Sequence, residues 1–544
     1  MDSPEAPLIP DDQRNGELQY DADDADAASV ANKAEMRPGA FVLLLTFAAG
    51  ISGLLFGCVF TSQIQTSAFV TWANLATDDT GVVSATLVSI GTSLSDRMLT
   101  SMDMSVITSS TSLFALIISP FSSVLADRLG RKRVILYADA LFVLGALIQA
   151  YSSTVTGMVI GRCVIGAAVG AASFVVPLYI AEIAPASHRG RLVTMNVLFI
   201  TLGQAVAYIV GWVFSTFGSE GTGWRWMVGL GALPGVMQAA IVVFMPETPR
   251  WLVKVGRPAD AKLVIQKVNG GTAASTRNAD LVVKQIEAEA REEREARRLR
   301  EHQGSGPWKW LGAWQELMSE GKNRRAVAIA CLLQGLQQLC GFNSLMYFSA
   351  TIFTLVGFKS PTLTSLTVAV TNFVFTMVAL SLIDRIGRRR ILLYSLPFMM
   401  LGLLMSAFGF SFITLGPSSD VDAEAAGDDG AGPAAGIILV SIMVYVAAFA
   451  IGLGNVPWMQ SELFPLSVRS LGSGVATATN WGSNFVIGLT FLPLMDALSP
   501  SWTFVLYAAI CAVGYFLIWR IYPETAGLSL EEATALLEND WGVR

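Results

Sequence analysis

The chain has 544 residues, of which 53% are hydrophobic and only 14% are charged. Soluble domains carry about 25% charged residues, so this composition excludes a soluble protein of this length with an ordinary solvated surface. Much of the acid behind the net charge of −6 lies in the N-terminal tail and in one loop, so the charge does not indicate a nucleic-acid partner and we expect none.

Apolar blocks of about 20 residues recur along the chain, and this is the length that crosses a bilayer as an α-helix. The acidic residues 1–36 before them predict a disordered cytosolic tail. The pattern predicts an all-α membrane protein with twelve transmembrane helices. Their expected ranges are 41–58, 105–126, 134–153, 158–180, 192–215, 225–246, 325–351, 362–383, 391–415, 434–463, 468–495 and 503–522.

Lys and Arg gather in the links that follow even-numbered spans. The link 127–133 after the second span holds four bases, and the link 384–390 after the eighth repeats its pattern. The loop 416–435 after the ninth span holds five acids and no base. Because basic links favour the cytosolic side of a membrane, we expect both termini in the cytosol.

The chain divides into two halves that repeat short motifs at matching places. A helical cytosolic linker, 249–324, is expected to separate a six-helix half at 37–248 from another at 325–523, with a cytosolic tail at 524–544. The repeated motifs are Asp127-Arg-Leu-Gly-Arg-Lys with Asp384-Arg-Ile-Gly-Arg-Arg, Glu182-Ile-Ala-Pro with Glu462-Leu-Phe-Pro, and Pro246-Glu-Thr with Pro523-Glu-Thr. Pseudo-symmetric bundles with a polar site between them are a design of transporters.

These motifs together resemble the sugar porter family of the major facilitator superfamily. Further signatures are Gly161-Arg162, the Pro-Arg that ends Pro246–Arg250, and Gln337-Gln-Leu-Cys-Gly-Phe-Asn343. A narrower resemblance, to fungal myo-inositol transporters, rests on the stretches 343–349, 452–465 and 476–481. Hexose members more often carry Tyr-Tyr where this chain has Tyr347-Phe348.

The resemblance implies a major facilitator fold and a monomeric secondary active transporter in the plasma membrane. Import of a polyol or sugar, most of all myo-inositol, by proton symport through alternating access is expected. The alternatives are a glucose-like hexose transporter or facilitator, and a non-transporting sugar sensor, which the short tail 524–544 disfavours. No nucleophile–base set, metal cluster or phosphate loop is found, so we expect no enzyme activity, no metal and no cofactor.

Uncharged amides suit a polyhydroxy substrate, because each offers donors and an acceptor without the cost of burying an ion. Aromatic rings offer flat apolar faces to the C–H face of a sugar ring. By resemblance, the residues that line the central path are Gln204, Gln337, Gln338, Asn343, Tyr347, Asn372, Trp458, Asn480 and Trp481. A single amide could instead join two helices. This is less expected for the adjacent Gln337 and Gln338, because Gly341 can loosen the helix near them.

Two charged residues are expected within the membrane. Asp79 looks like the titrating carboxylate of the family's first span, and Arg162 in the fourth span is expected to modulate it. Asp79 is separated from the rest of its motif by residues 59–78, which read as a genuine extracellular insertion or as an unspliced intron, the second being favoured. A static ion pair is the alternative to proton coupling.

A second set of charges lies at the cytosolic ends of the spans. The resemblance implies that they form salt bridges that hold the two halves together when the cavity faces outward, and the basic members also serve as topology signals. The members of this inner gate are Arg131, Glu182, Arg189, Glu247, Arg250, Arg388, Arg389, Glu462, Arg469 and Glu524.

Overall fold

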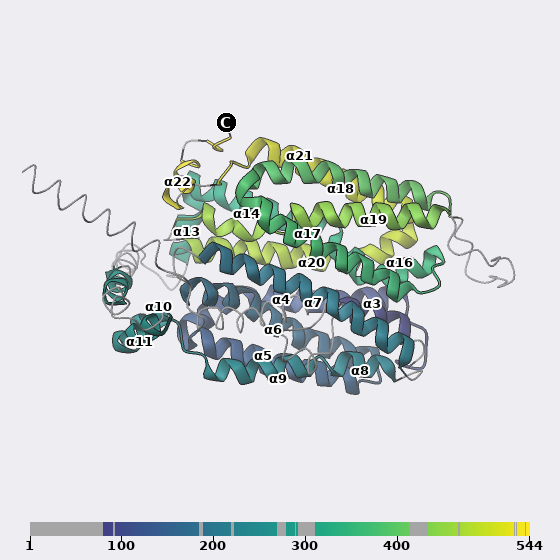
Figure 1. The fold of residues 1–544 in the computed structure, drawn as a ribbon, viewed down its shortest axis with the longest axis horizontal. Coiled ribbons are helices and arrows are strands. Elements are labelled where there is room, and N and C mark those ends of the chain that lie inside the picture. Colours follow the sequence, from purple (N-terminus) through teal and green to yellow (C-terminus); the bar gives the residue numbers. More distant parts are fainter. Residues whose placement is uncertain are drawn as a thin grey trace, which may run out of the picture.

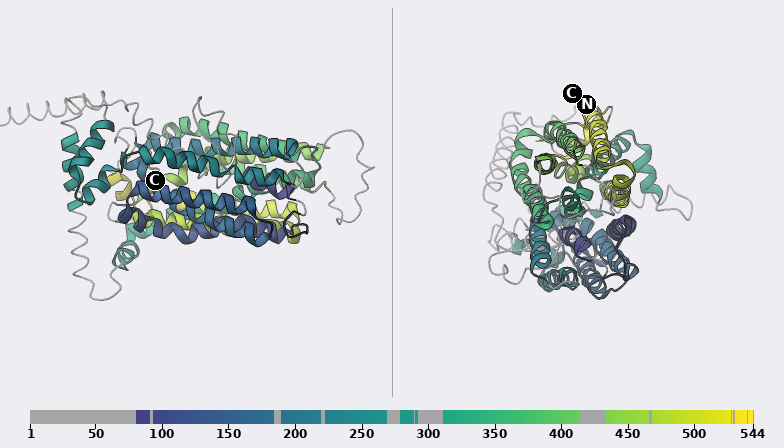
Figure 2. Two further views of the ribbon diagram at one scale, coloured as in Figure 1. Left: turned by 90° about the horizontal axis from the view of Figure 1, so that it is seen from below. Right: turned by 90° about the vertical axis from the view of Figure 1, so that its right-hand side faces the viewer.

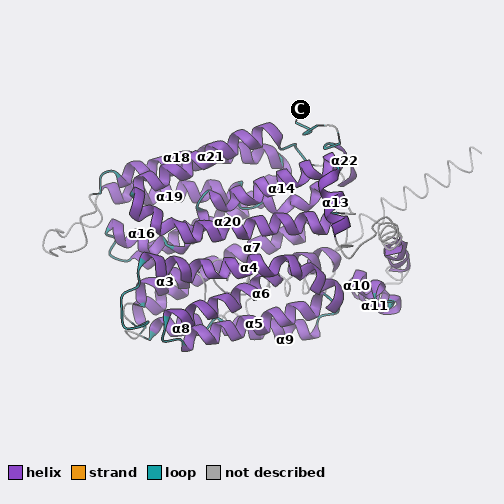
Figure 3. Ribbon diagram, turned by 180° about the vertical axis from the view of Figure 1, so that it is seen from behind, coloured by secondary structure: helices purple, strands orange, loops and turns teal. Residues whose placement is uncertain are grey.

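The structure is a computed structural model, and every element in the part of the chain that it describes is helical (Figures 1 and 3). The predicted N-terminal tail, the first predicted span, the segment 59–78 and Asp79 lie outside the described residues. The described residues are 80–90, 93–183, 189–218, 222–268, 279–288, 290–291, 311–413, 433–465, 468–526, 528, 530–538 and 540–543.

The helices follow the predicted spans in order. The N-terminal half contains α3 (Thr80–Ser89), α4 (Ser101–Leu129), α5 (Arg131–Tyr151), α6 (Val155–Ile183), α7 (Arg189–Phe217), α8 (Gly223–Gly229) and α9 (Ala232–Phe244). The linker contains α10 (Pro249–Lys254), α11 (Pro258–Val268), the helical residues 279–288 and α13 (Leu311–Ser319). The C-terminal half contains α14 (Gly321–Leu339), α15 (Phe342–Tyr347), α16 (Ser349–Val356), α17 (Pro361–Ile386), α18 (Arg388–Phe410), α19 (Pro433–Ile451), the 3-10 helix η2 (Val456–Leu463), α20 (Arg469–Leu498) and α21 (Pro500–Ile521), and α22 (Leu530–Ala535) follows it.

Among the described residues, ten segments are long and apolar enough to cross a membrane. The long helix α20 corresponds to another predicted span, so helices stand at the places of all the predicted spans except the first. The first predicted span, 41–58, lies outside the described residues, and α3 begins after the segment 59–78. The multi-pass membrane architecture predicted from the apolar blocks is therefore confirmed.

The two halves form two bundles that lie side by side (Figures 1 and 2). Across their boundary, α4 packs along α20, α7 packs along α17, and α3 meets α15 and α16. The helices α10, α11, α13 and α22 gather at one end of the molecule, which also carries the basic links and is called the basic end below. The opposite end is called the far end.

Several spans that were predicted as continuous helices are interrupted. The sixth divides into α8 and α9, the seventh into α14, α15 and α16, and the tenth ends as α-helix at Ile451 and resumes as η2. Gly341, expected to loosen the seventh helix, stands between α14 and α15 with a φ of +87°. A glycine adopts this left-handed conformation without the penalty that a Cβ brings.

The helical residues 279–288 of the charged linker contact α11. Among them, Ala279 and Val283 are buried in a cluster with Val264 and Val268 of α11. Lys262 and Asp280 join the same two helices by an ion pair of 2.6 Å. The linker helix therefore packs by one apolar face onto α11.

Replacing Gly341 with Ala should destabilise the protein by about 1–3 kcal/mol, because the new Cβ would demand a positive φ from an ordinary residue. The Cβ would also lie 3.1 Å from the ring of Tyr507. Thermal unfolding of the detergent-solubilised protein measures the loss. Gly436→Ala on α19 is the control, since an added Cβ there meets no atom within 4 Å, and an equal loss in both variants would contradict the account.

Candidate functional site

A chain of buried amides joins the seventh and eleventh spans inside the C-terminal half. Gln338 donates to the Asn480 side chain at 3.0 Å, and Asn343 donates to Gln338 at 2.6 Å. All three side chains belong to residues that are at most 5% exposed. The break at Gly341 separates Gln338 from Asn343, so the two amides reach each other around the interruption.

The same chain extends to the broken tenth span. Asn480 donates to the side chains of Gln334 and Gln337 at 2.6 and 2.8 Å. Gln337 in turn donates to the Leu453 carbonyl at 2.8 Å, and Gln334 donates to the Pro457 carbonyl at 3.1 Å. These amides therefore satisfy carbonyl groups that the interrupted helix leaves open within the membrane.

Two amide contacts cross from one half to the other. Asn484 donates to Ser112 of α4 at 2.8 Å, and it also lies 3.3 Å from the hydroxyl of Tyr347. Asn372 of α17 donates to Gln204 of α7 in a short hydrogen bond. Of the predicted amides, Gln204 and Asn372 therefore meet directly across the boundary between the two bundles.

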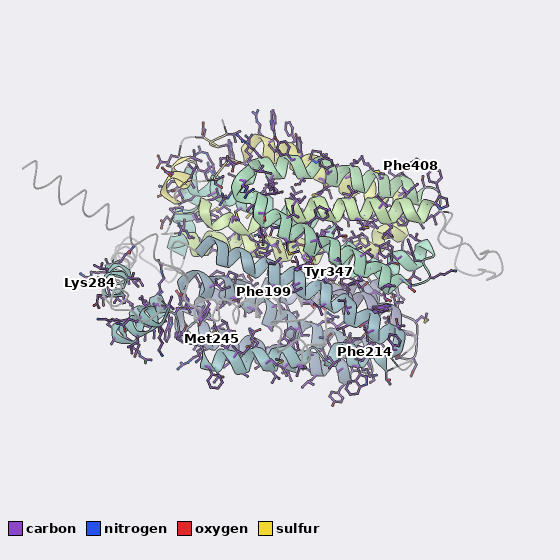
Figure 4. The ribbon with its side chains drawn as sticks, in the orientation of Figure 1. Phe199, Phe214, Met245, Lys284, Tyr347 and Phe408 are labelled. Atoms are coloured by element: carbon purple, nitrogen blue, oxygen red, sulfur yellow. The ribbon has the colours of Figure 1, made fainter. Side chains whose placement is uncertain are left out.

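The predicted aromatic residues lie at the same boundary. Figure 4 shows Tyr347 between the two bundles, and its residue is 5% exposed. Trp481 of α20 is 2% exposed and clusters with Phe142 and Ile165 of the other half, with the half-buried Trp458 packed against this cluster. The side chains predicted to bind substrate therefore lie in the C-terminal half or at its boundary with the other bundle, to which the N-terminal half contributes Gln204.

Sequence reasoning missed Gln334, Asn484 and Ser112. The signal for the first two was present, because Gln334 lies four residues before Gln338 and Asn484 four residues after Asn480. Residues four apart share one face of a helix. Ser112 carried no such signal, since its role depends on how the two halves pack.

At the far end, side chains of the N-terminal half bond the backbone at the break between α15 and α16. Tyr208 donates to the Met346 carbonyl at 2.6 Å and lies 3.1 Å from the Ser349 hydroxyl. The Ala350 N–H donates to Ser84 at 2.9 Å. In an unbroken α-helix this N–H would serve the Met346 carbonyl, so two side chains of one half replace one backbone bond of the other. We call these five residues the far-end junction.

Of the pair predicted to couple protons, the structure describes only Arg162. It lies on α6 and is 1% exposed. Asp79 precedes the first residue of α3 and lies outside the described residues. Their joint role therefore stays a prediction.

The glutamate of the sixth-span motif binds backbone groups at the basic end. Glu247 accepts from the N–H of Arg131 at 3.0 Å and from the N–H of Lys132 at 3.2 Å, which are the first residues of α5. Gly130 lies directly before them with a φ of +94°, and an added Cβ would lie 2.3 Å from the Glu247 carboxylate. Burial raises the pKa of Glu247, while its backbone hydrogen bonds and Arg131 act in the opposite direction.

The twelfth-span motif repeats this arrangement in the other half. Glu524 accepts from the N–H of Arg388 at 2.8 Å and from the N–H of Arg389 at 3.1 Å, at the start of α18. Gly387 has a φ of +98° and would place a Cβ 2.5 Å from Glu524. The repeated Gly and Glu thus form one device twice: a carboxylate that caps the positive end of a helix dipole.

Three further inner-gate residues, Arg131, Arg389 and Arg469, bond to partners in their own half. Arg131 pairs with Glu182 at 2.8 Å, and both side chains are nearly buried. Arg389 donates to the Trp519 carbonyl at 2.8 Å, and Arg469 donates to the Phe464 carbonyl at 3.0 Å. The side chains of Arg189 and Glu462 lie outside the described part, and Arg250 lies at the start of α10. That these charges join the two halves stays a prediction.

Replacing Glu247 with Gln should lower stability by about 1–2 kcal/mol, because an amide keeps one acceptor oxygen and loses the charge that complements the helix dipole. Glu524→Gln should have a similar effect on the other half. Thermal unfolding measures both. Glu538→Gln, at an exposed residue, should leave the unfolding temperature unchanged, and equal shifts in all three variants would contradict the caps.

Comparison with known proteins agrees with this geometry. The profile of the family described as sugar (and other) transporter matches residues 44–537. Myo-inositol transporter 1 of Cryptococcus neoformans var. grubii is 40% identical over 521 residues, covering 96% of this chain and 85% of that protein. Myo-inositol transporter 1 of Candida albicans is also 40% identical, covering 94% of this chain and 86% of that protein.

Solved structures share the fold. A partially occluded, inward-open structure of the xylose transporter XylE from E. coli matches with a TM-score of 0.69 and 23% identity, covering 90% of this chain and 100% of that chain. The major facilitator superfamily proton:xylose symporter XylE bound to 6-bromo-6-deoxy-D-glucose matches with a TM-score of 0.71 and 24% identity. The match covers 92% of this chain and 100% of that chain. The fold is that of the major facilitator superfamily, and this chain is a multi-pass membrane transporter that belongs to the sugar (and other) transporter family.

Proposed function

We propose that this protein imports myo-inositol by proton symport through alternating access. The observation that carries the proposal is the buried amide chain of Gln338, Asn343 and Asn480 in the C-terminal half, which continues through Asn484 to Ser112 of the other half. The relatives that are 40% identical are named as myo-inositol transporters, which supports the choice of substrate. The protein acts as a monomer in the plasma membrane, with both termini in the cytosol.

The amides suit a ring that carries hydroxyls on every carbon. Their donors and acceptors are satisfied by one another without ligand, so hydroxyls of a substrate exchange hydrogen bonds rather than create unpaired groups. Trp458 and Trp481 add flat apolar surface beside them. No charged side chain is needed to bind a neutral polyol, and the aromatic faces take its C–H groups.

Proton coupling is assigned to Asp79 and Arg162. A carboxylate near a buried arginine and a polar path binds a proton when its surroundings are dry and releases it when they become wet. Arg162 has the burial that this role needs. The charges of the inner gate close the basic end when the path opens outward.

Uptake into proteoliposomes tests the function directly. We expect accumulation of radiolabelled myo-inositol that depends on an inward proton gradient, and weaker uptake of glucose. Faster uptake of glucose than of inositol would show that the substrate is a hexose. Uptake that reaches only the external concentration, with or without a proton gradient, would show facilitated diffusion and contradict symport. A protein that binds sugar without moving it would be a sensor.

Two variants separate the parts of this assay. Asn480→Ala should raise the KM for inositol roughly tenfold or more, because several amides lose a partner at once. Asn323→Ala, a buried amide that bonds Glu316 and Glu320 at the basic end, is its control.

Asp79→Asn should abolish gradient-driven accumulation while exchange of internal for external inositol continues, and accumulation at the wild-type level would contradict coupling through Asp79.

Tyr208→Phe should weaken the far-end junction and shift the population toward the outward-open state by roughly fivefold or more, since one hydrogen bond contributes about 1 kcal/mol. Labelling of cysteines placed at the far end should become faster. Tyr179→Phe is a matched control, because the Tyr179 hydroxyl also donates to a backbone carbonyl, that of Pro246 at 2.8 Å, but within one half. Equal labelling in both variants would count against the junction as a gate.

A further inference from the structure

Asp139 carries a carboxyl group in the membrane-spanning part of the N-terminal half. It belongs neither to the amide chain nor to the charged groups at the helix ends. It is the ninth residue of α5, which begins at Arg131. With a rise of 1.5 Å per residue, Asp139 lies about 12 Å along the helix axis from Arg131. This distance places it within the hydrocarbon region of the membrane. The residue is 4% exposed.

The Oδ2 atom of Asp139 is buried, and among the residues that the structure describes no group donates a hydrogen bond to it. Its neighbours along α5, Ala138 and Phe142, belong to buried apolar clusters. The facing helix α9 comes close, since a Cβ added to Gly235 would lie 3.7 Å from the Asp139 carbonyl and 2.9 Å from Val143. Such close packing leaves little room for water.

The charged and titratable groups on the helices packed against α5 lie away from this depth. Arg162 of α6 lies at the level of Gly145, because Gly145 packs against Gly161 and Ile165. Gly145 is six residues from Asp139, or about 9 Å along the axis. No residue of α9 is titratable, and its buried Gln238 offers only an amide. The other such groups are Asp103, Asp127 and Arg128 on α4, Cys163, Tyr179 and Glu182 on α6, and Arg225 on α8, and they lie at the level of Arg162 or toward the helix ends.

We propose that Asp139 is a second proton-binding site, separate from the substrate path, and that it keeps its proton throughout the transport cycle. An ionised carboxylate without a donor or cation in a dry apolar site carries a large desolvation cost, which a bound proton removes. A neutral carboxyl group also gains an O–H donor that the ionised form lacks.

The position of α5 explains why this proton stays in place. The helices against which α5 packs most extensively are α4, α6, α8 and α9, and all belong to its own half. Figures 1 and 2 show α5 and α9 on the side of the N-terminal half that is turned away from the other bundle. When the two halves rock against each other as rigid bodies, the surroundings of Asp139 do not change, so the proton is not part of the coupling.

The sign of the pH dependence follows from linkage. Asp139 stays protonated in the folded protein, whereas an exposed aspartate in the unfolded chain ionises near pH 4. The wild type therefore loses stability as pH rises above about 4, because the unfolded chain releases a proton that the folded protein retains. A residue that cannot titrate has no such loss.

The experiment compares Asp139→Asn with the wild type in detergent. We expect the difference in unfolding temperature, variant minus wild type, to grow by several degrees in favour of the variant between pH 4 and pH 8. Infrared spectra at neutral pH should show a carboxylic-acid C=O band in the wild type that the variant lacks. The control is Asp260→Asn at an exposed ion pair with Arg257, which should give a difference that does not grow in the variant's favour and should leave the band in place.

Uptake completes the test. Asp139→Asn should keep the wild-type accumulation of substrate under a proton gradient. A temperature difference that is flat with pH, or an unchanged infrared band, would overturn the proposal, and lost accumulation with exchange intact would show that the proton cycles. Asp139→Leu, also without a titratable group, repeats the stability test if the Asn variant does not fold. The unfolding temperatures and infrared spectra are measured without substrate. Their outcome is therefore independent of whether the protein transports inositol.

Discussion

Backbone groups released by a break inside the membrane must find partners in the protein, because lipid offers none. The seventh and tenth spans are both broken, and side chains serve the groups that these breaks release. The Cys340 carbonyl accepts from Tyr445 at 2.9 Å, and the Leu453 carbonyl accepts from Gln337. Asn455 donates to the Ala450 carbonyl at 2.6 Å. Much of the buried polar content of the C-terminal half follows from this one requirement.

The two halves share a scaffold but not a site. The carboxylates Glu247 and Glu524 cap equivalent helices in the same way, and the glycine before each helix makes room for them. The amides that line the boundary come mainly from α14, α15 and α20, and the N-terminal half adds Gln204 and Ser112. The helix ends of the two halves are thus symmetric, while the polar surface in the middle is asymmetric.

The number of residues in each apolar block predicted the spans from the second onward, and the basic links and repeated motifs predicted the two bundles. The amides were predictable too, because a polar side chain within an apolar block has to serve a purpose. Gly341 marked one break in advance, since glycine tolerates a positive φ.

Other features depend on tertiary contacts that no local pattern reports. Phe348, at the second break of the seventh span, has no sequence feature of a breaker. Glu247 was expected to pair with side-chain cations, and its partners include backbone N–H groups. Asp139 lies in an apolar block whose mean hydropathy stays high despite this one acid. That its Oδ2 atom is buried without a hydrogen bond follows from the packing of neighbouring helices and not from the sequence.

The far-end junction has a consequence for how the path opens. The Met346 carbonyl and the Ala350 N–H are four residues apart, the spacing of partners in an α-helix. When Tyr208 and Ser84 move away with their half, these two groups are free to bond each other, and α15 and α16 join into one rod. The two backbone groups thereby exchange one hydrogen-bonded arrangement for another, so neither of them is left unsatisfied. The seventh span therefore has two hydrogen-bonding arrangements open to it, and a ligand that binds one of them more tightly shifts the population toward that one.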